Sequence, residues 1–304
     1  ALVSVVAGSP LKMSSDGDLT TVKGDIFTVQ FDNRNGSIYS LMYNNQNVII
    51  DGNGPKLNAL RAPTDNDRNM VPFWMFINIW QGENLDREFN KTYHAEIKNG
   101  IIKVKAGVAG VSRRPYFQYD MSVSIFVNGA VTYHINGNVA ENAEFLPRLG
   151  FEFKLPKENN AFGYFGYGPG ESYCDMMHHA KLAYYSSTAE QEYVKYARPQ
   201  EHGNHTGVKL LEIGNMAFAK GTDINVSQYS AHQLYQAKHT DEIGESDGIY
   251  LHIDYKQSGL GSNSCGPELA EKYRFNETEF SSSVTIKPVF AAEVNPYREA
   301  ATEY

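Results

Sequence analysis

Short apolar–polar alternations separated by Asn-Gly pairs are the feature that most constrains how this chain folds. Every second residue is apolar over residues 117–127, and the alternation resumes over 131–135 after Asn128-Gly129. A period of two places one face of a strand against a core, and Asn-Gly favours a type I′ hairpin turn. Asn35-Gly36 and Asn99-Gly100 repeat the device. The pattern predicts a succession of antiparallel hairpins.

Further strand-like segments bring the expected total to at least about ten strands. They cover residues 24–31, 145–154, 160–167, 208–219, 223–229, 248–256 and 281–290. Helical signals are limited to Phe73–Gln81 and Ser230–Ala237, the second with Ser230 as a candidate N-cap. Strands and helices do not alternate as a parallel sheet requires. We therefore expect an all-β fold, a large antiparallel sandwich of two sheets.

The length fits one large domain or two smaller ones. The chain has 304 residues, of which 41% are hydrophobic, and it contains no Pro/Ser-rich linker near its middle. We predict one domain over residues 16–290, preceded by a tail or linker over 1–15 and followed by a tail over 291–304. The opening residues ALVSVVAGSP lack a basic region and an initiator Met, which fits a piece of a longer polypeptide.

The net charge limits the kinds of partner that the chain can bind, and the cysteine count limits how it can be cross-linked. The net charge of −8 provides no positive surface for nucleic acid, and no apolar run is long enough to span a bilayer. We expect a soluble protein, cytoplasmic or periplasmic in a bacterium, without a nucleic-acid or membrane partner. Cys174 and Cys265 are too few for a disulfide scaffold or a four-cysteine zinc site. Two unpaired thiols are expected, with a single bridge as the alternative.

Four segments interrupt the strand pattern and gather polar residues with Gly and Pro. The first, residues 61–68, contains Arg61, Asp65, Asn66 and Asp67. Asp and Asn side chains at this spacing stabilise turns by accepting hydrogen bonds from backbone N–H groups. Their oxygens could also ligate a cation or bind sugar hydroxyls. The sequence favours the turn and leaves the other two roles open.

The second segment, residues 166–173, places Glu171 and Tyr173 on an irregular loop, suited to carbohydrate contact or to locking the loop. The third, residues 198–205, brings Glu201 and His202 close to a second imidazole. These groups could form an acid–base pair or a weak metal site, or they could cap a loop.

The fourth segment, residues 259–268, surrounds a thiol with small and polar residues. The residues expected to face a ligand or a neighbouring domain are Ser262, Asn263, Ser264 and Cys265. A catalytic cysteine would need an activating base, and His252 is the nearest in sequence. We consider that role the weaker alternative.

Together the four segments resemble, in order and spacing, the C-terminal β-sandwich of glycoside hydrolase family 2, lacZ-type β-galactosidases. That family carries Arg-Ala-Pro-x-Asp-Asn-Asp, Gly-x-Gly-Pro-x-Glu-x-Tyr, Pro-x-Glu-x-Gly and Gly-x-Gly-x-x-Ser motifs. Residues 61–67, 166–173, 199–203 and 259–264 match them. The resemblance covers about residues 20–290 and implies a supersandwich of the galactose mutarotase-like kind.

The resemblance also implies where the chemistry lies. In the family, two glutamates on a (β/α)8 barrel hydrolyse β-galactosides with retention, and this chain contains no such barrel pattern. We therefore expect no catalytic residue and no cofactor in this chain, with room for a divalent cation or Na+ in the parent enzyme. The implied partners are the barrel and sandwich domains, a galactoside at their junction and a second subunit. The family's aromatic platform is replaced here by Cys265, which weakens the expectation of sugar stacking.

Two other functions remain open at the level of sequence. An independent aldose 1-epimerase would draw its acid and base from Glu201, His202 and His205. A free-standing carbohydrate-binding module would use exposed aromatic rings such as Trp74 and Trp80. An exposed apolar patch where the chain meets its neighbours is expected around residues 71–80 and the Cys265 loop.

Overall fold

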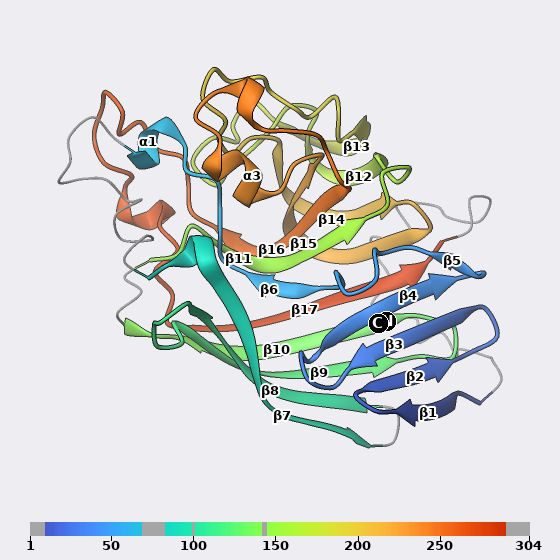
Figure 1. Cartoon of the computed structure of the whole chain (residues 1–304). Helices are drawn as coiled ribbons and strands as arrows, with labels where there is room; N and C mark the ends of the chain where they lie inside the picture. The colour runs from blue at the N-terminus through green and yellow to red at the C-terminus, as the bar shows by residue number, and fades with distance from the viewer. Residues whose placement is uncertain (1–9, 69–82, 99–100, 142–144, 290–304) are drawn as a thin grey trace.

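The computed structural model describes residues 10–68, 83–98, 101–141 and 145–289 (Figure 1). Its strands are β1 Lys12–Asp16, β2 Leu19–Lys23, β3 Phe27–Asp32, β4 Ser37–Tyr43, β5 Gln46–Asn47, β6 Lys56–Asn58, β7 Glu88–Lys98, β8 Ile101–Gly110, β9 Phe117–Ile125, β10 Val131–Val139, β11 Arg148–Leu155, β12 Ala161–Gly168, β13 Lys181–Thr188, β14 Asn204–Ile213, β15 Met216–Ser227, β16 Ile249–Gln257 and β17 Glu279–Pro288. The helical elements are α1 Asp65–Arg68, α3 Ala231–Gln236 and the 3-10 turns η2 Leu85–Arg87, η4 Thr240–Glu242 and η5 Glu271–Tyr273.

The strands form two antiparallel sheets, which confirms the all-β prediction. Within the described residues, the smaller sheet has five strands in the order β1-β2-β3-β4-β5, and the larger has twelve. Figure 1 shows the small sheet lying across one half of the strongly curved large sheet. Apolar residues of both sheets, including Phe31, Ile38, Val104 and Val123, share one buried cluster. This shared core makes the two sheets a single sandwich.

The predicted hairpin over β9 and β10 is confirmed, but its turn type is different. Gly129 has a left-handed backbone (φ +84°), whereas Asn128 does not, and the Gly129 N–H donates to the Phe126 carbonyl at 2.9 Å. A type I′ turn needs positive φ at both central residues. Asn35-Gly36 likewise has positive φ only at its glycine, and Asn99-Gly100 lies outside the described residues.

Two predicted boundaries are wrong. Residues 208–219 were expected to form one strand, but they contain the turn at Gly214-Asn215, where β14 ends and β15 begins. The tail predicted over residues 1–15 overlaps β1, Lys12–Asp16, which pairs with β2. All five β1 side chains are exposed, so this edge strand shows no apolar alternation in its sequence.

The predicted helix near residue 230 is confirmed as α3. The Ser230 Oγ accepts from the Gln233 N–H, and the Gln233 side chain accepts from the Ser230 N–H, which completes a capping box. The helix predicted over residues 73–81, and with it Trp74 and Trp80, lies outside the described residues. Cys174 and Cys265 are free thiols, as expected. Among the described helices, none has the length and apolar character needed to cross a bilayer.

Candidate functional site

The four segments singled out in the sequence meet in the folded chain. We call residues 61–67, 166–173, 198–205 and 259–266 together the motif cluster. The first and third segments are joined by one hydrogen bond to a side chain and one between backbones. The Asp65 N–H donates to Gln200 Oε1 at 2.8 Å, and the Glu201 N–H donates to the Ala62 carbonyl at 3.1 Å. The fold therefore brings together two segments that are about 135 residues apart in the sequence.

The second and third segments are joined by the Glu171 carboxylate and by two hydrogen bonds between Ser172 and Asn204. Glu171 Oε2 accepts from the Gly203 N–H at 2.8 Å. The Ser172 N–H donates to the Asn204 carbonyl at 2.6 Å, and Asn204 Nδ2 donates back to the Ser172 carbonyl at 2.9 Å. Glu171 thus locks a loop, which was one of the two roles that its sequence left open.

Arg61 joins the first segment to the fourth. Its side chain is completely buried, and Nη2 donates to both Asp67 oxygens at 2.8 and 3.0 Å. Nη1 donates to the Ser258 carbonyl at 2.5 Å. Asp67 Oδ2 also accepts from the backbone and hydroxyl of Thr64. Removing one partner of a buried charge pair leaves the other charge uncompensated. Arg61 and Asp67 therefore hold the 61–67 turn against the strand that leads into the fourth segment.

Asn66 clamps the loop of the fourth segment directly. Its Nδ2 donates to the Gly261 carbonyl at 2.7 Å, while its Oδ1 accepts from the Ser264 N–H at 3.0 Å. On the other side of the loop, the Asp175 carboxylate accepts from the N–H groups of Leu260 and Gly261 at 3.0 and 2.7 Å. Two side chains from distant segments thereby fix the path of residues 259–266 (the clamped loop) through backbone contacts alone.

The glycines of the clamped loop follow from this geometry. A Cβ atom at position 259 would lie 2.5 Å from Cγ of Asp175, closer than any carbon contact allows. Gly261 adopts φ +67°, a left-handed conformation that a residue with a side chain rarely takes. The first glycine is thus required by the carboxylate that holds the loop, and the second by its left-handed backbone.

A second buried ionic group, formed by Arg148, Asp254 and Glu201, holds the third segment against β11 and β16. Arg148 on β11 donates from Nε and Nη2 to Asp254 Oδ2 at 3.1 and 2.8 Å, and its Nη2 lies 3.6 Å from Glu201 Oε1. Glu201 Oε1 also accepts from the amides of Asn225 and Gln257, each at 3.2 Å. These partners were missed at the sequence level. The available signal was an acid and a basic residue within strands that are otherwise largely apolar.

The motif residues divide into buried and accessible side chains. Five of the predicted carbohydrate contacts are buried and are too enclosed to touch a ligand: Arg61, Asp67, Tyr173, Glu201 and His202. Their burial disfavours direct contact with a carbohydrate, and the polar groups of Arg61, Asp67, Glu201 and His202 bond to other parts of the protein instead. Asn263 is also buried, whereas Ser262, Cys265 and Asp65 are exposed and Ser264 is partly exposed.

The two imidazoles of the third segment have separate partners. His205 Nδ1 lies 3.0 Å from the Tyr164 hydroxyl, and its Nε2 lies 3.2 Å from Glu192 Oε2. His202 Nδ1 donates to the Gln200 carbonyl at 2.8 Å. Both side chains are buried, and Glu201 binds Arg148, Asn225 and Gln257 instead of either imidazole. The described geometry therefore offers no acid–base pair for an aldose 1-epimerase in this segment.

The geometry also bears on the cation and cysteine alternatives. Both Asp67 oxygens are occupied by Arg61, so this carboxylate is not offered to a cation. In the part of the chain that the structure describes, no group of three or more His, Cys, Asp or Glu side chains could hold a metal ion. His252 lies buried within 3.7 Å of Glu152, so its interactions are made on β11 and not with Cys265.

Comparison with known proteins places the motif cluster in a protein family. The model of the family described as beta galactosidase small chain matches residues 23–286, which contain the entire motif cluster. The chain belongs to the β-galactosidase small-chain family. It is 35% identical to a β-galactosidase of Actinobacillus pleuropneumoniae over 90% of the chain and 27% of that protein. It is 31% identical to a β-galactosidase of Staphylococcus xylosus over 86% of the chain and 26% of that protein.

The family members named above are much longer than this chain. The chain spans about a quarter of the length of each of these two β-galactosidases, so most of their length lies outside the match. Among solved structures, a galactose 1-epimerase from Lactobacillus acidophilus aligns with 92% of the chain and 98% of its own length. Its sequence identity to this chain is 12% and the TM-score is 0.49.

Proposed function

We propose that this chain is a non-catalytic module of a β-galactosidase and that its motif cluster holds the clamped loop against the catalytic part. The observation that carries the proposal is the double hydrogen bond from Asn66 to Gly261 and Ser264. It joins the family's first and last motifs into one structural unit. The exposed Ser262 and Cys265 side chains project from this unit and are available to a neighbouring domain or its substrate.

The acids of the motif cluster favour a supporting role over a catalytic one. Retaining glycoside hydrolysis needs two carboxyl groups about 5–5.5 Å apart on either side of the scissile bond. Asp67, Glu171 and Glu201 each bind structural partners in the described residues. The two catalytic glutamates therefore come from the barrel that the family resemblance implies, and any divalent cation or Na+ belongs to that part as well.

The proposed substrate is a terminal β-galactoside that reaches the clamped loop at the domain junction. A thiol offers little of the flat apolar area with which an aromatic ring stacks on a sugar. Cys265 therefore contributes shape to the pocket wall and little binding energy. The proposal includes a second subunit as a partner of the complete enzyme, as the family resemblance implies.

The test is a replacement experiment. The matched quarter of the Actinobacillus pleuropneumoniae β-galactosidase is exchanged for this chain, and turnover of a nitrophenyl β-galactoside is compared for the fusion, for the relative lacking that quarter and for this chain alone. We expect turnover by the fusion and none by the other two. Turnover by this chain alone, or a folded but inactive fusion, would overturn the proposal.

A further inference from the structure

The strand β7 forms one edge of the large sheet (Figure 1). It is eleven residues long and pairs with β8 on one side, and within the described residues no strand pairs with its other side. Alternate backbone N–H and C=O groups of an edge strand point away from its neighbour and can pair with a further strand. β7 therefore offers a long edge to another polypeptide.

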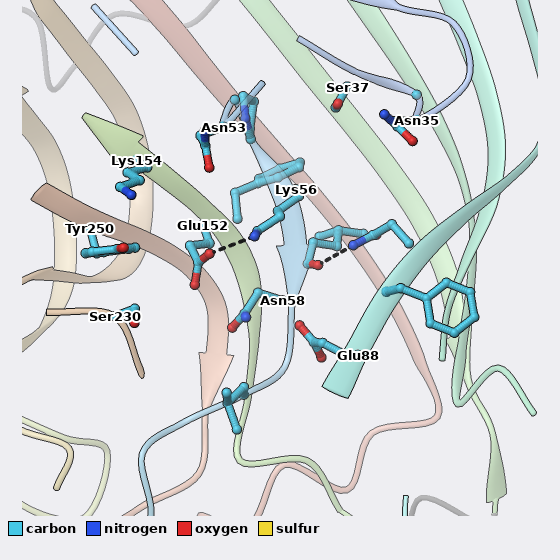
Figure 2. A pocket seen from close by; sticks show the side chains of 18 of the residues that line it. Asn35, Ser37, Asn53, Lys56, Asn58, Glu88, Glu152, Lys154, Ser230 and Tyr250 are labelled. Carbon is cyan, nitrogen blue, oxygen red and sulfur yellow. Dashed lines mark hydrogen bonds and ion pairs between the residues drawn. The ribbon is translucent and has the colours of Figure 1, made fainter. Parts of the chain in front are cut away.

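The inward face of β7 is held by its own chain. The Ala59 N–H donates to the two Glu88 oxygens at 3.2 and 3.1 Å, and Asn90 Nδ2 donates to the Leu57 carbonyl at 2.8 Å. Figure 2 shows Glu88 beside β6. Because these contacts occupy the inward face, a partner would join β7 at its edge and its outward face.

The outward face of β7 and β8 exposes large apolar side chains. Phe89 and Tyr93 on β7 are 45% and 46% exposed, and Ile101 on β8 is 40% exposed. The Tyr93 side chain lies over Gly107, where a Cβ atom would be 3.0 Å from its hydroxyl oxygen. Aromatic side chains are enriched at protein–protein interfaces. This face therefore suits a protein partner.

A β-bulge at Tyr93 decides how β7 could pair with a second copy of itself. Thr92 pairs with Ala106 and His94 pairs with Lys105, so Tyr93 is an extra residue in β7. Thr92 faces the small sheet, whereas Tyr93 and His94 both face outward. The alternation of inward and outward side chains is therefore shifted by one residue between the two halves of the strand.

This shift selects one register for two β7 strands related by a two-fold axis. Residues directly opposite each other in an antiparallel pair lie on the same face. Only the register that sets the two bulges opposite each other meets this condition along the whole of β7. In that register Lys91 of each copy lies opposite Glu96 of the other, and both side chains are exposed on the outward face.

The charges of β7 agree with the register that its geometry selects. Opposite charges directly across an antiparallel pair stabilise it, and like charges destabilise it. Lysines and bulges on an edge strand usually discourage pairing with other strands. In β7 the same features exclude most registers and leave one in which the Lys91–Glu96 pair occurs twice. The edge is therefore protected against other strands but complementary to itself.

We propose that two copies of this chain associate through their β7 strands, antiparallel about a two-fold axis, with Lys91 of each copy opposite Glu96 of the other. Tyr93 and His94 of both copies meet at the axis, which covers part of the exposed apolar surface. The proposed function includes a second subunit, and this inference rests on that part alone. It involves neither the clamped loop nor hydrolysis, so its failure leaves the replacement experiment untouched.

The experiment measures self-association of the 304-residue chain by sedimentation equilibrium, without any assay of hydrolysis. Lys91→Glu and Glu96→Lys each place like charges opposite one another, and the double variant restores opposite charges with their positions exchanged. Lys209→Glu is the matched control. It changes the net charge as Lys91→Glu does, at an exposed position on β14.

We expect a reversible dimer with a micromolar dissociation constant, weakened about tenfold or more by each single reversal and restored to within about threefold by the double variant. Lys209→Glu should change it less than about twofold. Thermal unfolding checks that each variant remains folded. A monomer at all concentrations up to about 200 μM would overturn the proposal. So would a dimer that either single reversal leaves unchanged, that Lys209→Glu weakens equally, or that the double variant does not restore.

Discussion

At the scale of single residues, Asn66 holds the clamped loop from two sides. Its amide donates to one side of the clamped loop and accepts from the other, at 2.7 and 3.0 Å. The Asn amide offers both a donor and an acceptor on one short planar group, which is what the two contacts require. Asp in its place would present an acceptor to the Gly261 carbonyl, and Ala would leave both groups without a partner.

We predict that Asn66→Ala speeds amide hydrogen exchange in residues 259–266 by about tenfold or more, because the Ser264 N–H loses its acceptor. Exchange measured by mass spectrometry checks this. Asn215→Ala is the control, since Asn215 donates to Gln46 in an exposed contact elsewhere. Equal protection of the clamped loop in both variants would show that Asn66 does not hold it.

A second prediction at this scale concerns Arg61. We expect Arg61→Ala to lower the free energy of unfolding by about 3–5 kcal/mol, because Asp67 would remain buried without its cation. Arg34→Ala provides the contrast, since Arg34 pairs with Asp18 on the exposed surface, where solvent screens the pair, and its loss should change the free energy of unfolding far less. Urea unfolding measures both. Similar losses for the two variants would contradict the structural role of the buried pair.

The sequence predicted the turn at residues 61–67 but not which of its side chains would be accessible. Asp and Asn oxygens in a turn bind backbone N–H groups or ligands equally well, so spacing alone leaves the choice open. The decision depends on Arg61, whose buried guanidinium occupies Asp67, and on Gln200, which occupies the Asp65 N–H. Arg61 belongs to the same segment, but its burial depends on the distant Ser258 carbonyl, and Gln200 is 135 residues from Asp65, so tertiary packing decides which oxygens stay accessible.

At the scale of elements, two acids face each other across β15 and β16. Asp223 pairs in register with Asp254. Burial and the neighbouring carboxylate raise the pKa of Asp223 to about 7. Burial also raises the pKa of Asp254 to about 6, although Arg148 opposes the shift. The folded protein therefore binds protons at these positions more tightly than the unfolded chain does, and protonation favours the folded state.

We predict that the stability contributed by Asp223 is complete below about pH 4 and is lost as the pH rises toward 7, by up to about 1.4 kcal/mol per pH unit. Asp223→Asn should therefore flatten the pH dependence of unfolding between pH 4 and 7. The measurement is urea unfolding across that range for the variant and the unmodified chain. An unchanged slope in the variant would show that Asp223 does not titrate in this way.

The elements show what apolar alternation can and cannot predict. Strands with one buried face, such as β9 and β10, were located within a few residues because their side chains alternate. The edge strand β1 was missed because none of its side chains is buried. The β14–β15 turn was missed because Gly214-Asn215 joins two largely buried strands and interrupts the apolar pattern only briefly.

At the scale of the whole molecule, the motif cluster joins segments about 200 residues apart into one support for an exposed loop. The four motifs occur in one sequence in the order typical of the family, and the structure shows that they also lie together in space. Each segment satisfies buried polar groups of another, so a change in one leaves unpaired groups in the next.

The most direct test of this account uses the β-galactosidase fusion described above, with Asn66→Ala and Asn215→Ala introduced separately. The quantity measured is kcat/KM for a nitrophenyl β-galactoside, with thermal unfolding as a check on the fold. We predict a loss of about tenfold or more for Asn66→Ala and less than about twofold for Asn215→Ala. An unchanged kcat/KM in a folded Asn66→Ala fusion whose clamped loop exchanges faster would contradict the claim that the motif cluster holds this loop for catalysis.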